Sequence, residues 1–167
     1  GRILIPLFLY EKGLLSSPMF YLSAYLEKNR DAYYGGLSGI SSEGNWNNWF
    51  IFFLKAIIEQ SKVNSEKAKS IIDLYDQMKV EFSKSTRSQF SIQALDALFD
   101  KPIFTTTNFI NRSGISKNSA LKILHDLEGN NILTVVREGS GRRPTLLIFN
   151  QLINLVEGKN ISAKYTK

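Results

Sequence analysis

The sequence predicts a mostly α-helical protein in two parts, and three observations lead to that prediction. Apolar residues recur at helical spacing over most of the 167 residues. Two short strand-like runs, residues 132–136 and 145–149, lie near the C-terminal end. A polar stretch of small residues at 83–88 has the composition of a linker. We therefore expect a helical bundle at residues 1–85, a second domain at 86–158 and a flexible tail at 159–167.

Four helices are predicted in the first part. Residues 3–10 are apolar nearly all round, which is typical of a buried central helix, and Gly13 is expected to end it in the left-handed conformation. A second helix runs from about Ser23 to Tyr34, after which the glycines of residues 35–39 loosen the chain. Since a domain seldom opens on its most buried helix, we expect the front of this domain to be missing. The uncovered helix then predicts a homo-oligomer or a protein partner.

Two longer amphipathic helices follow. Asn45 is a candidate N-cap for the third helix of the chain, and Ser65 for the fourth. Apolar side chains three and four residues apart give each helix one face that is expected to be buried. In the third helix these are Trp46, Trp49, Phe50, Phe53, Leu54, Ile57 and Ile58. In the fourth they are Ala68, Ile71, Ile72, Tyr75, Met78 and Phe82.

The second part opens with a supporting helix at residues 91–99. The threonines at 105–107 offer hydroxyl caps for a short helix, which Gly114 ends with a left-handed turn that only glycine adopts cheaply. Ile115 then follows as an apolar plug between this helix and the next. A helix, a tight turn and another helix are therefore predicted.

The helix after the turn is the one on which the functional prediction rests. Ser116 is placed to cap it by accepting a backbone N–H near Ser119, and Gly129 with Asn130 ends it. Helical spacing predicts that one face is buried. That face carries Ala120, Leu121, Ile123, Leu124 and Leu127.

A β-hairpin completes the second part. The two strand-like runs flank a flexible turn, Gly139-Ser140-Gly141, which predicts a hairpin with arginines at its tip. Residues 151–157 are compatible with one last helix. Helix, turn, helix and hairpin in this order are typical of a winged helix-turn-helix.

The polar residues of this winged part suit an interface with DNA. A helix fits the major groove, and its first turns bring side chains to base edges. The short amide and hydroxyl are expected to face bases, and the lysines to face phosphates. Arginines on the hairpin turn suit a phosphate backbone or a minor groove. The candidates are Lys117, Asn118, Ser119, Lys122, Arg142 and Arg143.

Charge is distributed as this interpretation requires. Residues 86–167 contain 11 lysines and arginines against 6 acidic residues, a net charge of +5, whereas residues 1–85 contain 10 against 9, a net charge of +1. A basic domain beside a neutral one is the electrostatic footprint of nucleic-acid binding. The alternative is that the winged helix docks proteins or pairs subunits, and that its charge only keeps it soluble.

Other classes of function find little support. The absence of cysteine excludes disulfides and thiolate metal sites and is compatible with a cytoplasmic protein. His125, the single histidine, is expected on the exposed face of the second helix of the winged part, a poor place for catalysis. No apolar run approaches the length of a membrane span, and no signal sequence opens the chain, so no membrane partner is expected.

Several stretches of the first part resemble, in order, the Fic family. Residues 1–13, GRILIPLFLYEKG, are similar to the segment that closes the Fic signature H-x-F-x-D/E-G-N-G-R-x-G-R, and Gly1-Arg2 would be its last two residues. Residues 21–34 and the pair Trp46 and Trp49 are similar as well. The resemblance covers about residues 1–85, so the first part would be the C-terminal helices of a Fic-like domain. Bacterial members of the family often append a winged helix.

The resemblance implies that the parent protein is an adenylyltransferase, which moves AMP from ATP to a hydroxyl of a target protein. In the family a histidine is the base and an acidic residue holds Mg²⁺. Both precede the part of the signature seen here, so ATP and Mg²⁺ belong to the intact parent and no cofactor or metal to this fragment. The resemblance therefore assigns no catalytic residue to this chain, and the chain as given is expected to be inactive in AMP transfer.

By the same resemblance, Arg2 would contact a nucleotide phosphate, and Tyr33 and Tyr34 would lie beside the adenine. The alternatives are a solvated terminus for Arg2 and core packing for the two tyrosines.

Overall fold

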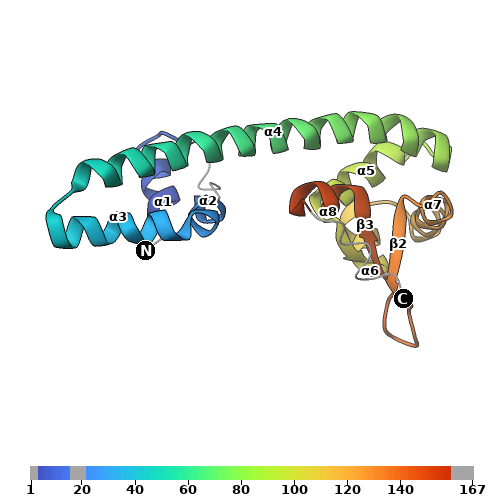
Figure 1. Cartoon of the computed structure of the whole chain (residues 1–167). Coiled ribbons are helices and arrows are strands. Elements are labelled where there is room, and N and C mark those ends of the chain that lie inside the picture. Colours follow the sequence, from blue (N-terminus) through green and yellow to red (C-terminus); the bar gives the residue numbers. More distant parts are fainter. Residues whose placement is uncertain (1–3, 16–21, 159–167) are drawn as a thin grey trace. The chain divides into compact units, whose positions relative to one another are not determined.

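The computed structural model describes residues 4–15 and 22–158, and in this part of the chain it is mostly helical (Figure 1). Eight helices and one three-stranded antiparallel sheet make up the described chain. The chain forms two compact units, residues 1–68 and residues 69–167. The sequence therefore predicted the helical class correctly. The tail predicted at 159–167 lies outside the described residues.

The first unit contains α1 (Leu4–Glu11), α2 (Leu22–Lys28), α3 (Arg30–Glu43) and the beginning of α4 (Trp46–Thr86). Its buried cluster is small: Leu22, Leu26 and Ala56 form the centre, with half-buried apolar side chains around them. Asn45 accepts a hydrogen bond from the backbone N–H of Asn48 at 3.3 Å, which confirms it as the cap of α4. Gly13 has φ 70°, as expected for the end of α1.

The expectation that α1 is buried is wrong. No residue of this helix is buried, and Leu4 and Phe8 are 66% and 55% exposed. The buried face predicted for the start of α4 is also wrong in part, because Trp49, Phe53 and Ile57 are half-buried but others lie open. The exposed ones are Trp46, Phe50, Leu54 and Ile58. Three buried side chains make too small a core to cover apolar stripes this wide.

The helix predicted to stop before the glycines instead breaks earlier. Asn29 separates α2 from α3, and α3 then continues through residues 35–39 to a left-handed Gly44. A glycine costs a helix only about 1 kcal/mol. Here Gly36 also permits close packing, because a Cβ atom on it would lie 3.0 Å from the indole ring of Trp49.

The third and fourth predicted helices are one helix, α4. Ser65 lies inside it rather than capping a new one. Residues 59–67 contain neither glycine nor proline, and they are joined along the helix by a Lys62–Glu59 ion pair and a hydrogen bond from Gln60 to Asn64. Polar composition alone therefore did not interrupt the helix.

The stretch at 83–88 is likewise not a linker, because α4 continues to Thr86. Phe82 is fully buried, and it belongs to the core of the second unit together with Met78. The two compact units divide between Ala68 and Lys69 rather than at the predicted boundary of 85 and 86. The last turns of α4 thus contribute apolar side chains to the second unit.

After α4 the second unit contains α5 (Ser91–Asp100), β1 (Ile103–Thr105), α6 (Thr106–Ser113), α7 (Lys117–Gly129), β2 (Leu133–Arg137), β3 (Leu146–Phe149) and α8 (Asn150–Glu157). The strand order is β1-β3-β2, and both pairs are antiparallel. One core joins all of these helices and the sheet. Its fully buried side chains include Phe82, Leu95, Leu98, Leu127 and Phe149.

Most of the predicted elements of this unit are confirmed. Thr105 caps α6 by accepting the N–H of Asn108 at 3.3 Å, and Gly114 ends α6 with φ 66°. Ser116 stands at the cap position of α7, but its hydroxyl is bonded to the Ser119 hydroxyl, so the predicted bond to a backbone N–H is wrong. Leu121 was expected on the buried face and is 40% exposed.

Candidate nucleic-acid interface

The first two turns of α7 present polar side chains to solvent. Lys117, Asn118 and Lys122 are exposed, whereas Ser119 is half-buried and its hydroxyl is already engaged with that of Ser116 at 3.0 Å. The opposite face of the helix is held in the core by Ala120, Ile123, Leu124 and Leu127. Because one face of α7 is held in the core, the opposite, polar face is held toward solvent.

The turn between α6 and α7 orients the second helix relative to the first. Gly114 takes the left-handed conformation, and Ile115, directly after it, is only 3% exposed. The backbone N–H of Ile115 donates to the Ser113 hydroxyl at 3.3 Å. The predicted apolar plug is thus confirmed, and it anchors the start of α7 to the same core that holds the sheet.

The loop between β2 and β3 presents the two arginines of the prediction. Arg142 and Arg143 are both exposed. Paired backbone hydrogen bonds of 3.0 and 2.9 Å join Ser140 and Arg143, so that Gly141 and Arg142 form a two-residue turn. Gly141 has φ 56°, a conformation that suits glycine at the first position of such a turn. The turn predicted as flexible is hydrogen-bonded.

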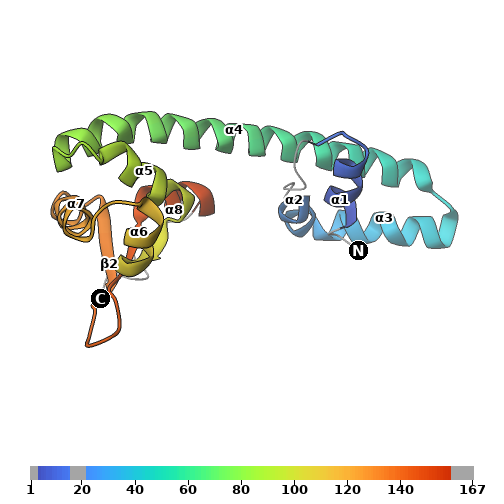
Figure 2. The same cartoon turned by 180° about the vertical axis from the view of Figure 1, so that it is seen from behind.

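A second set of contacts closes the base of this loop. The backbone N–H of Gly139 donates to the Thr145 hydroxyl at 3.1 Å. A Cβ atom at Gly139 would lie 3.0 Å from that hydroxyl and 3.1 Å from the carbonyl oxygen of Arg143, so glycine is needed there for space. In both Figure 1 and Figure 2 the loop after β2 extends away from the helices of its own unit.

The candidate cations are not neutralised within the described part of the chain. Lys117, Lys122, Arg142 and Arg143 form no ion pair there, whereas Arg112 pairs with Asp100. Acidic residues on α7 lie in its last turns, at Asp126 and Glu128, away from the lysines at its start. Because α7 and the β2–β3 hairpin share one core, a single scaffold presents four positive charges that no described carboxylate pairs.

The candidate nucleotide-binding residues are separated from this interface in the sequence and belong to the first unit. Tyr33 is half-buried, and its ring lies 5.6 Å from that of Trp49 and 6.5 Å from that of Phe52, which favours the packing interpretation. Tyr34 is 49% exposed, with the Arg30 guanidinium 5.6 Å from its ring. Arg2 lies outside the described residues.

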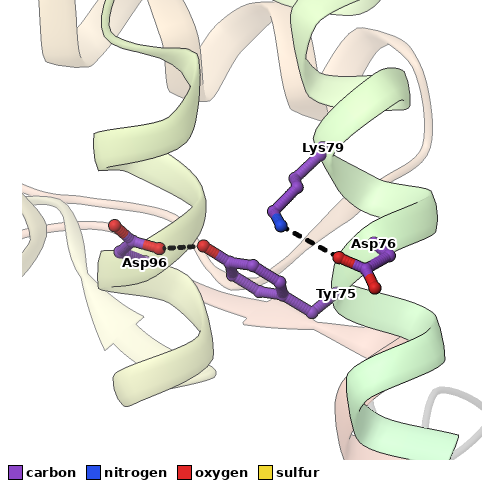
Figure 3. Close-up of polar contacts among 4 residues, drawn as sticks. All are labelled: Tyr75, Asp76, Lys79 and Asp96. Carbon is purple, nitrogen blue, oxygen red and sulfur yellow. Dashed lines mark hydrogen bonds and ion pairs between the residues drawn. The ribbon is translucent and has the colours of Figure 1, made fainter.

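Sequence reasoning missed a polar cluster that joins α4 to α5 (Figure 3). The Tyr75 hydroxyl donates to Asp96 at 2.5 Å, and its ring packs edge-on against Phe99. Lys79 pairs with Asp76 at 2.9 Å and lies 4.7 Å from the centre of the Tyr75 ring. Tyr75 and Asp96 are 21 positions apart, so spacing gave no sign of this contact.

Tyr75 and Lys79 both keep their protons to a higher pH than usual. The hydrogen bond to Asp96, then desolvation, raises the pKa of Tyr75, and the bond to Asp76 raises the pKa of Lys79. The tyrosine is thus held in its protonated, donating form. The cluster joins α4 to α5 within the second unit.

Other kinds of site find no support in the described part of the chain. It contains no group of three histidines, cysteines or carboxylates that could hold a metal ion. His125 is exposed on α7, as expected. Among the described helices, none combines the length and the apolar character that crossing a bilayer demands. No family model matches the chain.

Proposed function

We propose that the second unit is a winged helix-turn-helix that binds duplex DNA, with α7 in the major groove and the β2–β3 loop against the backbone. The element order α5-β1-α6-α7-β2-β3 and the tight turn at Gly114 support this interpretation. The observation that carries it is the set of four exposed cations on α7 and the loop, none paired within the described residues. Phosphate oxygens are the ligands that such a set attracts.

The side-chain contacts refine the role proposed for each candidate. Asn118 is exposed and its side chain makes no hydrogen bond within the described chain, so its amide is available to a base edge. Ser119 is less available, because its hydroxyl is shared with Ser116. In this proposal Asn118 contacts bases, Ser119 assists from the side, and Lys117, Lys122, Arg142 and Arg143 contact phosphates.

The first prediction concerns the loop. Replacing both Arg142 and Arg143 with alanine should weaken binding to unrelated duplexes alike, and it should reduce the slope of log affinity against log salt by about 0.9 for each phosphate that is no longer bound. Fluorescence anisotropy with a labelled duplex at several salt concentrations measures both quantities. Lys101→Ala is the matched control, because Lys101 lies beyond the Ile103 end of β1, at the opposite end of the sheet from the loop.

An unchanged salt slope in the double variant would remove the loop from the interface. If the wild-type chain shows no salt-dependent binding to duplex DNA, the proposed function fails. The alternative, a winged helix that docks a protein or pairs subunits, would then be the one to pursue.

For residues 1–85 we propose the C-terminal helices of a Fic-like domain, and the support for this is the resemblance of the sequence. In this proposal the helices adjoin the nucleotide site of an adenylyltransferase and, by themselves, transfer no AMP. Incubating the chain with ATP, Mg²⁺ and candidate target proteins should give no adenylylated product. Transfer of AMP by this chain would contradict the proposal, because the residues that the family uses as base and metal ligand are not in this sequence.

A further inference from the structure

Arg137 occupies an irregular position in the sheet. It is the last residue of β2 and stands opposite Leu146, whereas Val135 stands opposite Leu147. Val136 is therefore an extra residue, a β-bulge, placed just before the arginine. Bulges commonly re-aim the side chain that follows them. The bulge brings Arg137 into register with the start of the loop.

The side chain of Arg137 has a hydrogen-bond donor without a partner. It is half-buried, its Nε atom is hidden from solvent, and that atom has no hydrogen-bond partner in the described chain. No ion pair neutralises it there either, in contrast to Arg112, which pairs with Asp100. A guanidinium cannot give up its charge at ordinary pH. A hidden N–H without an acceptor lowers the stability of the fold, so packing alone does not account for an arginine at this position.

The position of Arg137 places it on the same hairpin as the two loop arginines. The pairing of Arg137 with Leu146 and the bridge between Ser140 and Arg143 belong to one register, three residues apart. At about 3.3 Å for each residue, Arg137 lies about 10 Å along the hairpin from that bridge. Three arginines thus follow one another from the base of the loop to its tip.

We propose that Arg137 binds a phosphate oxygen of duplex DNA at the base of the loop. The proposal rests on the proposed function and adds a residue to that interface. The charged fork of a guanidinium matches the oxygens of a phosphate, and the terminal nitrogens of Arg137, which are not hidden as Nε is, can donate to one. Arg142 and Arg143 would then extend the contact toward the tip.

The test compares two variants of the full chain by anisotropy over a range of salt. Arg137→Gln removes the charge, and Arg137→Met keeps the apolar stem. Each should weaken binding about tenfold, as expected when a hydrogen bond to a charged group is removed, and lower the salt slope by about 0.9. The weakening should be equal on unrelated duplexes, because phosphates carry no sequence. Lys101→Gln, which removes one positive charge at the far end of the sheet, should change the affinity much less.

Thermal unfolding separates a binding role from a structural one. If Arg137 is retained for DNA, Arg137→Met removes a hidden, unpaired N–H and should leave the unfolding midpoint unchanged or raise it. A lowered midpoint with unchanged DNA affinity would overturn the proposal, as would a weakening confined to one DNA sequence, which indicates a base contact. If the loop variants lose affinity and the Arg137 variants do not, this inference alone fails. If the wild-type chain binds no duplex, the proposed function fails with it.

Discussion

At the scale of single residues, Tyr75 shows how one hydroxyl can fix a long helix to a folded unit. Its bond to Asp96 and its edge contact with Phe99 lie between α4 and α5. The apolar side chains Met78 and Phe82 follow it on α4 and enter the core. The hydroxyl therefore adds direction to a contact whose main stabilisation comes from burial.

The Tyr75→Phe variant tests this contact. It keeps the ring and removes the hydrogen bond, so the free energy of unfolding should fall by at most about 1 kcal/mol. Urea unfolding followed by circular dichroism measures the change, and Tyr34→Phe, on an exposed ring of the first unit, is the control. An unchanged midpoint would show that the bond contributes nothing in solution.

The pH dependence of the same contact has a definite sign. Because the pKa of Tyr75 is raised in the folded chain, the folded state holds this proton more tightly than the unfolded state does. The stabilisation is fully present below 10.0, the ordinary pKa of a tyrosine, and is lost as the pH rises through the raised value. Wild-type stability should therefore approach that of Tyr75→Phe in strongly alkaline buffer. A difference between the two proteins that persists there would contradict this assignment.

At the scale of elements, the spacing of apolar residues predicted the helices of the proposed interface. Prediction failed where a helix boundary was inferred from polar or glycine-rich composition. The helices α5 and α7, the left-handed Gly114 and the paired runs of the hairpin each follow a local rule and are confirmed, although Leu121 of α7 is exposed rather than buried. The strand β1 was missed because three residues after a proline are too few to show alternation.

The failures in the first part have a common physical cause. Polar residues and glycines lower helix propensity only slightly, so neither the serines near 65 and 85 nor the glycines at 35–39 ended a helix.

The residues of the proposed interface were only partly predictable from the sequence. Exposure of Lys117, Asn118 and Lys122 follows from helical period, whereas the Ser116–Ser119 bond and the unpaired Nε of Arg137 depend on side-chain packing.

Two leucines on α7 provide a prediction for the element that carries the proposed interface. Leu127 is fully buried and Leu121 is 40% exposed. Leu127→Ala should lower the free energy of unfolding by about 2–5 kcal/mol, because it leaves a cavity in the core, whereas Leu121→Ala should change it by less than about 0.5 kcal/mol. Urea unfolding of both variants measures the difference. Equal losses of stability would show that the burial of α7 is not as described.

At the scale of the whole molecule, the uneven distribution of apolar surface is the main feature. In the second unit one core joins helices and sheet, but in the first unit the described apolar side chains exceed what its small core can cover. Trp46, Phe50, Leu54 and Ile58 follow one another at four-residue intervals along α4, each more than half exposed. Exposed apolar stripes of this kind are typical of surfaces that another protein covers.

We therefore expect the chain to self-associate through this stripe, in keeping with the oligomer predicted from the sequence. Replacing Leu54 and Ile58 together with glutamate should shift the protein toward monomer in sedimentation velocity over a concentration series. Lys55→Glu and Glu59→Lys, neighbouring changes of charge that leave the stripe intact, are the controls. A wild-type chain that stays monomeric at the highest concentration would contradict the expectation.

The register of the hairpin determines how insertions would alter the reach of the β2–β3 loop. The bridge between Ser140 and Arg143 continues the pairing of Arg137 with Leu146. The arm that carries the arginines, residues 138–145, therefore keeps this pairing only if residues are added or removed in equal number on its two sides. Adding one residue to each side of the arm would lengthen its reach by about 3.3 Å and turn the tip to the other face. Adding two to each side would restore the original face. The reach of the arm is thus adjustable in discrete increments without any change to the core that supports it.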